Sequence, residues 1–299
     1  MYEMAVRFAP SPTGRLHIGN LRTAWISHWW AKKLRLPWHL RFEDIDAARV
    51  IQDPEEGSSL QQLSDLAALG MVPDEIVYQR LGAIRHYELF LMGIEAGAFY
   101  PCTCSRKEVG AALSSMTSAP HGANPVYSGK CRNRTFNRQA VQESSAWRFK
   151  SPGDESGAQD FLIGHGSALD AKDFSASYNF ACAADDYDGA FDLLVRAADL
   201  AGVLASQRSL QELFSRLESR VFGPSAVYHA ALVMNPEGGR LEKRSRGMTL
   251  SELQSDGFSV ARLVGAFDRS FQESVTSFFP ERVICETSES LNVQKILSP

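Results

Sequence analysis

The sequence predicts an α/β protein whose parallel sheet is interrupted by an insertion. The first 43 residues contain a strand, a turn rich in Gly and Pro, a helix and a second strand, which is how a βαβ unit begins. From about residue 100 to 176 the composition shifts to Cys, Ser, Gly, Pro and basic residues, and the α/β pattern returns afterwards. We therefore expect one α/β domain with an insertion and a small helical tail.

The individual elements follow from periodicity and from turn residues. A short apolar run over residues 3–9 predicts a buried strand that two prolines end. Residues 17–33 have helical length and composition, and the alternating segment 38–43 (WHLRFE) predicts the second strand. Pro with acidic neighbours at 53–56 predicts a helix start. The other expected elements are helices over 57–70, 82–98 and around 206–221, a strand at 146–150, and the returning α/β pattern at 178–184 and 191–195.

The composition is that of an ordinary globular protein, with 44% hydrophobic and 22% charged residues. Its net charge of −4, from 31 basic and 35 acidic residues, gives no overall attraction to nucleic acid. No apolar run approaches the roughly 18 residues of a membrane helix, and the N-terminus lacks a secretory pattern. We expect a cytoplasmic protein without membrane contact. The absence of a heptad repeat favours a monomer.

Two local runs of basic residues differ from this average. Such runs are usually solvated faces, and contact with phosphate is the alternative. The first run consists of Lys130, Arg132, Arg134 and Arg138, and the second of Arg240, Lys243, Arg244 and Arg246.

The segment 9–20 (APSPTGRLHIGN) lies between the first strand and the first helix. At this position a doubly wound sheet binds phosphate-bearing ligands. Gly14 and Gly19 permit close approach of the backbone, and His17 at the helix start can donate to a phosphate. A lone His-x-Gly is otherwise only a packed helix N-terminus, but the strand–turn–helix context favours the binding role.

Three of the five cysteines, Cys102, Cys104 and Cys131, fall within thirty positions. An odd number of cysteines without a secretory pattern argues against a disulfide framework. Cys-x-Cys supplies two thiolates, and Tyr127-x-x-x-Cys131 supplies a third with a phenol nearby, an arrangement that zinc prefers. Three reduced, buried cysteines are the alternative. A structural Zn²⁺ fits a loop-rich insertion that has little core of its own.

The segment containing His17 resembles the HIGH signature of class I aminoacyl-tRNA synthetases, with Asn20 in place of the final histidine, and residues 7–20 resemble the glutamyl branch. The resemblance continues in order through 41–46 (RFEDID), 178–181 (YNFA), 185–186 (DD), 195–200 (VRAADL) and 240–244 (RLEKR), the last in the place of the KMSKS loop. It implies a Rossmann-type catalytic domain that activates glutamate with ATP and Mg²⁺.

By the same resemblance, Arg7 and Arg196 would face the carboxylates of glutamate and Glu43 its ammonium group. Ser11 and Tyr178 would supply hydrogen bonds. Without the resemblance, Arg7 and Glu43 would suggest an ordinary ion pair at strand ends, and Tyr178 would suggest an aromatic side chain of the core. Phe8, Ala9 and Pro10 complete the implied glutamate site; His17, Gly19, Asn20 and Lys243 form the implied ATP site; and His17, Lys243 and Arg240 are the implied catalytic residues. Glu242 departs from the family, which usually has serine there.

The cysteine pattern, with Cys102, Cys104, Tyr127 and Cys131 as metal ligands, resembles the zinc site of the short glutamyl-Q tRNA(Asp) synthetase subgroup. The implied organisation is a first Rossmann half (1–99), a zinc- and acceptor-binding insertion (100–176), a second Rossmann half (177–239), and a KMSKS-like loop with helical tail (240–299). Only 55 residues follow Arg244, so we expect no anticodon-reading domain. The subgroup transfers glutamate to queuosine in tRNA(Asp). A minimal glutamyl-tRNA synthetase that charges the 3′ end, another nucleotidyltransferase of the same fold, and an idle tRNA- or partner-binding paralogue are the alternatives.

Overall fold

The structure is a computed structural model, which describes residues 4–45, 57–105, 108–109, 127–133, 146–153, 159–239, 241, 248–272, 276–279, 283–286 and 290–297. The chain forms two compact units, which are described separately. The first unit comprises Met1–Tyr78, Phe191–Ala198 and Ser225–Pro299, and the second comprises Gln79–Ala190 and Asp199–Pro224. None of the described helices has both the length and the apolar character that a membrane span requires.

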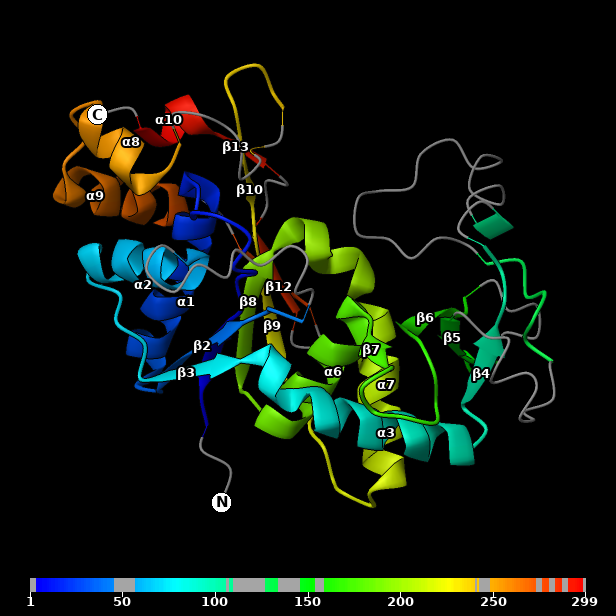
Figure 1. Ribbon diagram of the computed structural model, residues 1–299. Helices are drawn as coiled ribbons and strands as arrows, with labels where there is room; N and C mark the ends of the chain where they lie inside the picture. The colour runs from blue at the N-terminus through cyan, green and yellow to red at the C-terminus, as the bar shows by residue number, and fades with distance from the viewer. Residues whose placement is uncertain are drawn as a thin grey trace. The chain divides into compact units, whose positions relative to one another are not determined.

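The first unit is built on a mostly parallel sheet in the order β11-β12-β9-β8-β1-β2-β3 (Figure 1). Only the β11–β12 pairing among its described strands is antiparallel. The predicted α/β fold with a parallel sheet is confirmed. The strands are β1 (Val6–Phe8), β2 (Trp38–Phe42), β3 (Glu75–Tyr78), β8 (Leu193–Ala197), β9 (Ala226–Ala230), β11 (Thr276–Phe279) and β12 (Val283–Glu286).

One face of this sheet carries the apolar core of the unit. Val6 and Phe8 of β1 belong to the same buried cluster as Ile18 and Leu21 of α1 (Ile18–Leu34). Successive side chains of a strand point to opposite faces, so this face takes every second residue of β1, β2 and β8. The residues between them lie on the other face, where the polar side chains gather.

Helix α1 begins and ends at well-formed caps. The His17 side chain accepts the N–H groups of Gly19 and Asn20, and the Asn20 side chain accepts the His17 N–H, which completes a capping box. At the other end Arg35 adopts a left-handed conformation, with φ of 57°, and its N–H closes onto the carbonyls of Ala31 and Lys32. The predicted helix at 17–33 therefore lies where the sequence indicated.

The C-terminal part of the first unit contains the expected helices, α8 (Leu250–Ser255), α9 (Val260–Gln272) and α10 (Val293–Leu297). Strands that the sequence did not predict accompany them: β11 and β12 extend the main sheet, and β13 (Ser290–Asn292) pairs with β10 (Leu232–Met234). The remaining helix of this unit, α2 (Ser58–Ala68), follows the predicted helix start at 53–56, which lies outside the described residues.

A buried ion pair links strand β12 to α1. The Arg22 guanidinium binds both carboxylate oxygens of Glu286, at 2.9 and 2.8 Å. Arg22 also donates to the Ser270 hydroxyl of α9 at 2.9 Å. Bidentate pairing satisfies both charges away from water.

In its described residues, the second unit joins a small antiparallel sheet, in the order β4-β5-β6-β7, to the helices α3, α6 and α7. Its core consists largely of aromatic side chains such as Phe90, Trp147, Phe180 and Phe214. The elements are η1 (Gln79–Gly82), α3 (Ala83–Glu95), β4 (Phe99–Cys102), β5 (Ala146–Phe149), β6 (Phe161–His165), β7 (Ser175–Ala176), α6 (Tyr178–Gly189), and α7 (Leu204–Leu217), which η2 (Ala198–Val203) precedes along the chain.

Candidate active site and cysteine cluster

Two arginines implied in carboxylate binding lie on the same face of the parallel sheet. Arg7 of β1 pairs in register with Leu194 of β8, so Arg196, two residues further, points to the same side as Arg7. This is the face opposite the apolar core. Both side chains are buried, with 2% of Arg7 and 4% of Arg196 exposed. Guanidinium groups bind carboxylates in bidentate fashion, so the chemistry of this face is compatible with an anionic ligand.

Strand β2 adds one guanidinium and one carboxylate to this polar face. Arg7 pairs in register with His39, so Arg41 lies on the same side of the sheet. The Arg41 Nη2 atom is 3.5 Å from Glu43 Oε1, and both side chains are almost fully buried. The Glu43 N–H donates to the Pro10 carbonyl at 3.0 Å, which joins the loops that follow β1 and β2. Glu43 therefore lies where the parallel strands end.

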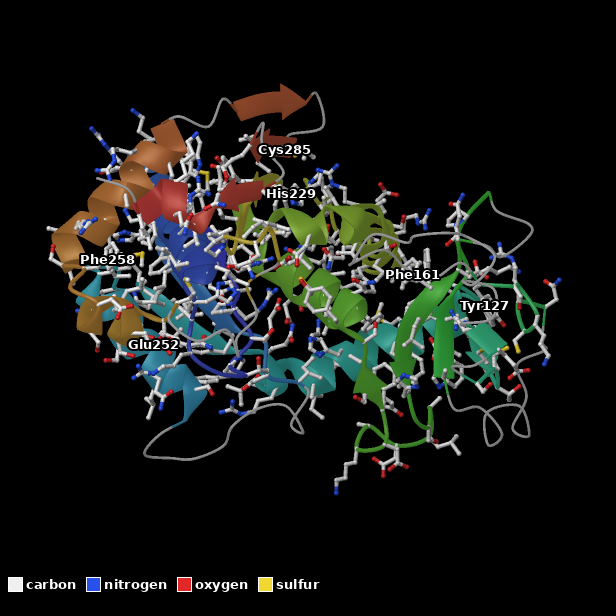
Figure 2. All side chains as sticks on the ribbon, turned by 90° about the horizontal axis from the view of Figure 1, so that it is seen from above. Tyr127, Phe161, His229, Glu252, Phe258 and Cys285 are labelled. Carbon is white, nitrogen blue, oxygen red and sulfur yellow. The ribbon has the colours of Figure 1, made fainter. Side chains whose placement is uncertain are left out.

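His229 is a buried polar residue that the sequence analysis did not single out. It pairs in register with Arg196 on one side and with Cys285 on the other, and Figure 2 labels both His229 and Cys285. In-register residues of parallel strands share a face, so His229 lies on the polar face beside Arg196. The signal in the sequence was a histidine within the otherwise apolar strand 226–230 (AVYHA). Arg41, which also lies on the polar face, appears in the sequence analysis only within the segment 41–46 (RFEDID).

The other implied glutamate-binding residues differ in their setting. The Phe8 side chain belongs to the apolar core, so any contact of Phe8 with a ligand would come from its backbone. Ala9, Pro10 and Ser11 follow β1 in the loop at its carboxyl end. Tyr178 is the first residue of α6 and is 39% exposed. It belongs to the second unit, where Ser177 caps its helix.

The hydrogen bonds of His17 determine which ring nitrogen faces a ligand. Nδ1 accepts the N–H groups of Gly19 and Asn20, at 3.1 and 3.4 Å. In the neutral imidazole the proton must then reside on Nε2. His17 therefore presents an N–H donor at the positive end of the α1 dipole, an arrangement suited to phosphate oxygen.

Gly19 lies in tight contact with the His17 ring that caps the helix. A Cβ atom at this position would lie 3.0 Å from His17 Cε1 and 3.3 Å from the Cβ atom of Val233. A side chain here would push the imidazole or Val233 away by a few tenths of an ångström. The His-x-Gly spacing therefore has a steric basis.

Most of the KMSKS-like loop lies outside the described residues. The predicted roles of Arg240, Glu242 and Lys243 therefore have no structural description. The segment directly after this loop returns to the N-terminus of α1. The Ile18 N–H donates to the Met248 carbonyl at 2.8 Å, and Thr249 forms a bridge with His17. Glu252, labelled in Figure 2, accepts the N–H groups of both Met248 and Thr249 and so fixes this return.

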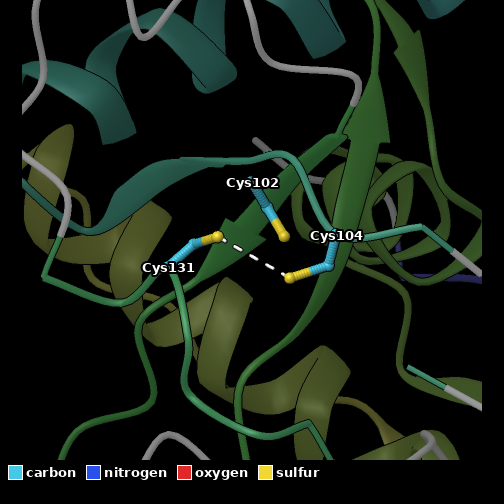
Figure 3. A group of neighbouring side chains, drawn as sticks. All are labelled: Cys102, Cys104 and Cys131. Atoms are coloured by element: carbon cyan, nitrogen blue, oxygen red, sulfur yellow. Dashed lines mark hydrogen bonds between the residues drawn. The ribbon is translucent and has the colours of Figure 1, made fainter. Parts of the chain in front are cut away.

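The three clustered cysteines of the second unit point toward one another (Figure 3). Their sulfur atoms all lie within 4.8 Å, and all three residues are buried. The Sγ atoms of Cys104 and Cys131 are 3.7 Å apart. A tetrahedral zinc ion with Zn–S bonds of about 2.3 Å has S–S edges of roughly 3.8 Å, so this spacing fits the metal.

The Tyr127 hydroxyl lies beside the sulfur atoms, 3.5 Å from Cys102 Sγ and 3.4 Å from Cys104 Sγ. It accepts the Cys131 N–H at 2.9 Å. Burial raises the pKa of Tyr127, and hydrogen bonds to the neighbouring thiols act in the same direction. The phenol therefore lies next to the thiols, and its role as a fourth metal ligand stays a prediction.

The electrostatic environment shifts the pKa values of two of the thiols in opposite directions. Burial raises the pKa of Cys131, but the Thr103 backbone N–H and the Tyr127 hydroxyl stabilise the thiolate and bring the value to about 7. Burial raises the pKa of Cys104 to about 11. The Arg148 Nε atom donates to Cys102 Sγ at 3.4 Å, and its guanidinium stacks on the Tyr127 ring at 3.9 Å. A buried cation beside three thiols offsets negative charge on the sulfur atoms.

The first basic run is not a continuous phosphate-binding surface. Arg132 is buried and pairs with Asp160, and it also donates to the Ser151 carbonyl at 3.0 Å. Arg132 therefore connects the turn that contains Cys131 to Ser151 and Asp160. Lys130 is exposed and lies 2.8 Å from Glu108, whereas Arg134 and Arg138 lie outside the described residues.

Comparison with known proteins gives these sites a context. The family model of class I tRNA synthetases (E and Q), catalytic domain, matches residues 3–294. A glutamyl-Q tRNA(Asp) synthetase of Deinococcus radiodurans is 34% identical over 270 residues, which cover 86% of this chain and 85% of that protein. One from Nocardia farcinica is 31% identical over 298 residues, covering 93% of this chain and 90% of that protein.

The fold agrees with that of a solved relative. The glutamate-tRNA synthetase of Elizabethkingia anophelis superposes with a TM-score of 0.66 at 20% identity, over 98% of this chain and 69% of that chain. This likeness supports the fold alone. Because the family model spans nearly the whole chain, the protein belongs to the class I tRNA synthetase (E and Q) catalytic-domain family and is a ligase of the aminoacyl-tRNA synthetase type.

Proposed function

We propose that the protein activates L-glutamate with ATP to form glutamyl-adenylate, and then transfers the glutamate to the queuosine base of tRNA(Asp). The main support is similarity over most of both chains to proteins named glutamyl-Q tRNA(Asp) synthetase. The polar face of the sheet and the N-terminus of α1 add support, because guanidinium groups suit carboxylates and a helix N-terminus suits phosphate.

Glutamate carries two carboxylates and one ammonium group. Arg7 and Arg196 lie on one buried face, and Glu43 lies at the end of the neighbouring strand β2. Guanidinium groups bind carboxylates in bidentate fashion, and a carboxylate binds an ammonium group. In this proposal the two arginines hold the carboxylates and Glu43 holds the ammonium. Ser11 and Tyr178 remain proposed hydrogen-bonding partners.

In the activation step, an α-carboxylate oxygen of glutamate attacks the α-phosphorus of ATP in line. A new O–P bond forms, the bond to the bridging oxygen breaks, and pyrophosphate leaves with its electron pair. No nucleophile on the protein is needed, so catalysis consists of positioning and charge neutralisation. His17 Nε2–H would donate to phosphate oxygen, with Gly19 and Asn20 at the helix N-terminus. ATP enters as its Mg²⁺ complex, so this ion belongs to the substrate.

Lys243 and Arg240 are proposed to neutralise the charge that develops on pyrophosphate. Met248, which follows this loop, is hydrogen-bonded to Ile18 at the N-terminus of α1. The chain therefore returns from the loop to the proposed phosphate site five residues after Lys243.

In the transfer step, a hydroxyl oxygen of the acceptor attacks the glutamyl carbonyl carbon, the bond from that carbon to the phosphate oxygen breaks, AMP leaves with the electron pair, and the hydroxyl proton passes to the departing phosphate or to solvent. We propose that residues 100–176 help to bind this acceptor. Cys102, Cys104, Cys131 and Tyr127 would hold a structural Zn²⁺, which supplies cross-links for loops that have a small core of their own.

The first test is glutamate-dependent ATP–pyrophosphate exchange, measured with and without tRNA. Transfer of labelled glutamate to tRNA(Asp) with and without queuosine follows. We expect exchange without tRNA, and transfer only to the queuosine-containing tRNA.

Exchange that requires tRNA, with label at the 3′ end, would instead identify a minimal glutamyl-tRNA synthetase. Absence of exchange under both conditions would contradict the ligase proposal and favour an idle, tRNA- or partner-binding role.

A further inference from the structure

The turn between β1 and α1 is held by a buried side chain from a different element. Gln62 lies on α2, 51 residues after Ser11 and 48 after Gly14. Its side chain is fully buried. The turn itself joins the proposed glutamate-binding segment, which ends at Ser11, to the proposed ATP-binding helix start at His17.

Gln62 Nε2 donates to the Gly14 carbonyl at 2.6 Å and to the Ser11 carbonyl at 3.2 Å. Both partners are acceptors, so the NH₂ group of the amide must face them. Its two N–H groups match the two carbonyls. The Gln62 Oε1 atom has no hydrogen-bond partner among the described residues. Among the described residues, the hydrogen bonds of the Gln62 side chain are therefore the two that it donates to the turn.

These bonds also fix the direction of the adjoining peptide groups. A trans peptide places its C=O and N–H on opposite sides. With the Gly14 carbonyl directed at Gln62, the Arg15 N–H points away from α2. Gly14 has a φ of 145°, a backbone region that favours glycine. Losing the amide would remove this donor from the Gly14 carbonyl, whereas the Ser11 carbonyl would keep the Thr13 N–H at 2.9 Å.

The end of the turn is held from two further directions. Asp65, one helical turn after Gln62, is buried; its burial raises the pKa of its carboxyl group, and the nearby Arg15 guanidinium opposes that shift. The Arg15 guanidinium donates to the Ser251 hydroxyl of α8. One face of α2 thus approaches the turn at two successive positions, while α8 holds it through Arg15.

We infer that Gln62 is a positioning residue for adenylate formation: it holds the 11–15 turn in the shape that sets ATP relative to glutamate. This inference rests on the proposed function, because the turn connects the two proposed ligand sites. Gln62 acts through the backbone and touches neither substrate.

The test compares Gln62→Met with Gln61→Met. Methionine keeps the length of the side chain and removes both donors. Gln61 is the neighbouring, half-buried glutamine on α2 and serves as the matched control. The readouts are the equilibrium Kd for ATP, KM and kcat of pyrophosphate exchange, and Tm.

We expect Gln62→Met to weaken ATP binding roughly 10- to 100-fold, as it would if the turn kept its binding shape only about 1–10% of the time, and to lower kcat as well. Tm should stay within roughly 5 °C of wild type, and Gln61→Met should match wild type. If Gln62→Met does not fold, Gln62→Asn withdraws the same amide by one methylene and should give the same pattern.

An unchanged Kd and kcat in the folded variant would overturn the inference, and so would a lowered Tm as the only effect. Equal loss in Gln61→Met would also overturn it. A wild-type protein that binds ATP without glutamate-dependent exchange contradicts the proposed function alone, since the two Kd values still test Gln62.

Discussion

The polar sheet face of the first unit and the cysteine cluster of the second unit assemble their side chains in different ways. Arg7 and Arg196 lie on adjacent parallel strands whose opposite face is a large apolar core. Cys104 and Cys131 are 27 residues apart in the sequence. Cys104 follows β4, and Cys131 lies in a turn. The apolar cluster around them is small and contains the cysteines themselves.

This difference shows where each site obtains its order. Strand register and core packing fix the arginines before any ligand arrives, which is the condition for electrostatic preorganisation. Cys102 ends strand β4, but Cys104 and Cys131 lie outside the strands, so bound metal would contribute directly to the folding of these two segments. Changes to the core of the first unit and changes to the cysteine ligands should therefore have separable consequences.

The largest effect is expected when the buried ion pair of the first unit is broken. Arg22→Met leaves Glu286 charged and unpaired in the interior, which should cost about 3–5 kcal/mol of unfolding free energy. Chemical denaturation followed by tryptophan fluorescence measures this, since Trp25 and Trp29 lie on the same helix.

The double variant Arg22→Met/Glu286→Gln is the control, because it removes the uncompensated charge and should recover part of the loss. A single variant within 1 kcal/mol of wild type would show that the core tolerates an unpaired carboxylate. It would weaken the contrast drawn between the two regions.

The next effect concerns the cysteine ligands. We expect Cys131→Ser to weaken zinc binding by more than the roughly 10- to 100-fold that loss of an outer-shell partner costs. Exchange without tRNA should remain close to wild type, because the sheet face is unaltered. Zinc affinity should also fall as the pH decreases, since protons compete with the metal for thiolates. Metal content per chain and competition with a chelator measure the zinc affinity of the variant and its dependence on pH.

Cys285→Ser is the matched control, as Cys285 lies on β12 of the first unit and outside the cluster. Equal zinc affinity for wild type and Cys131→Ser would contradict the metal assignment. In that case the alternative of three buried, reduced cysteines would stand.

Local signals in the sequence predicted much of this architecture, and long-range contacts account for what it missed. The helix at 17–33 was predictable because its cap and its composition lie in adjacent residues. The Cys-x-Cys spacing likewise indicated a cluster that the structure confirms. By contrast, Glu286 is 264 residues from Arg22, and Gln62 is 51 from Ser11. Such pairs depend on tertiary packing, which no local pattern encodes. The roles of Lys243 and Arg240 stay predictions, because these residues lie outside the described part of the chain.

A smaller effect is expected at the proposed glutamate site. Arg196→Ala removes one charged hydrogen-bonding partner of a carboxylate, worth about 1.5–3 kcal/mol. We therefore expect kcat/KM for glutamate to fall roughly 10- to 150-fold, with the Kd for ATP unchanged. Exchange kinetics at varied glutamate concentration measure kcat/KM for glutamate, and a direct binding experiment measures the Kd for ATP.

Arg196→Lys tests the role of the guanidinium, since it keeps the charge and loses the bidentate geometry; an intermediate loss is expected. Should Arg196→Ala weaken ATP and glutamate binding alike, Arg196 would act on the whole sheet edge instead of on one ligand.

The smallest effect is expected at the surface of the cysteine region. The Lys130 ammonium lies 2.8 Å from the Glu108 carboxylate, and the two side chains are 62% and 50% exposed. Solvent and salt screen such a pair, so Lys130→Ala should change stability by no more than about 1 kcal/mol and leave zinc content unaltered. If Lys130 contacts tRNA phosphate, its removal should reduce the slope of log affinity against log salt by about one. We expect an unchanged slope, because Glu108 already neutralises this lysine. A reduced slope would show that part of the first basic run binds tRNA after all, and that the surface of the cysteine region contributes to acceptor binding as well as to metal binding.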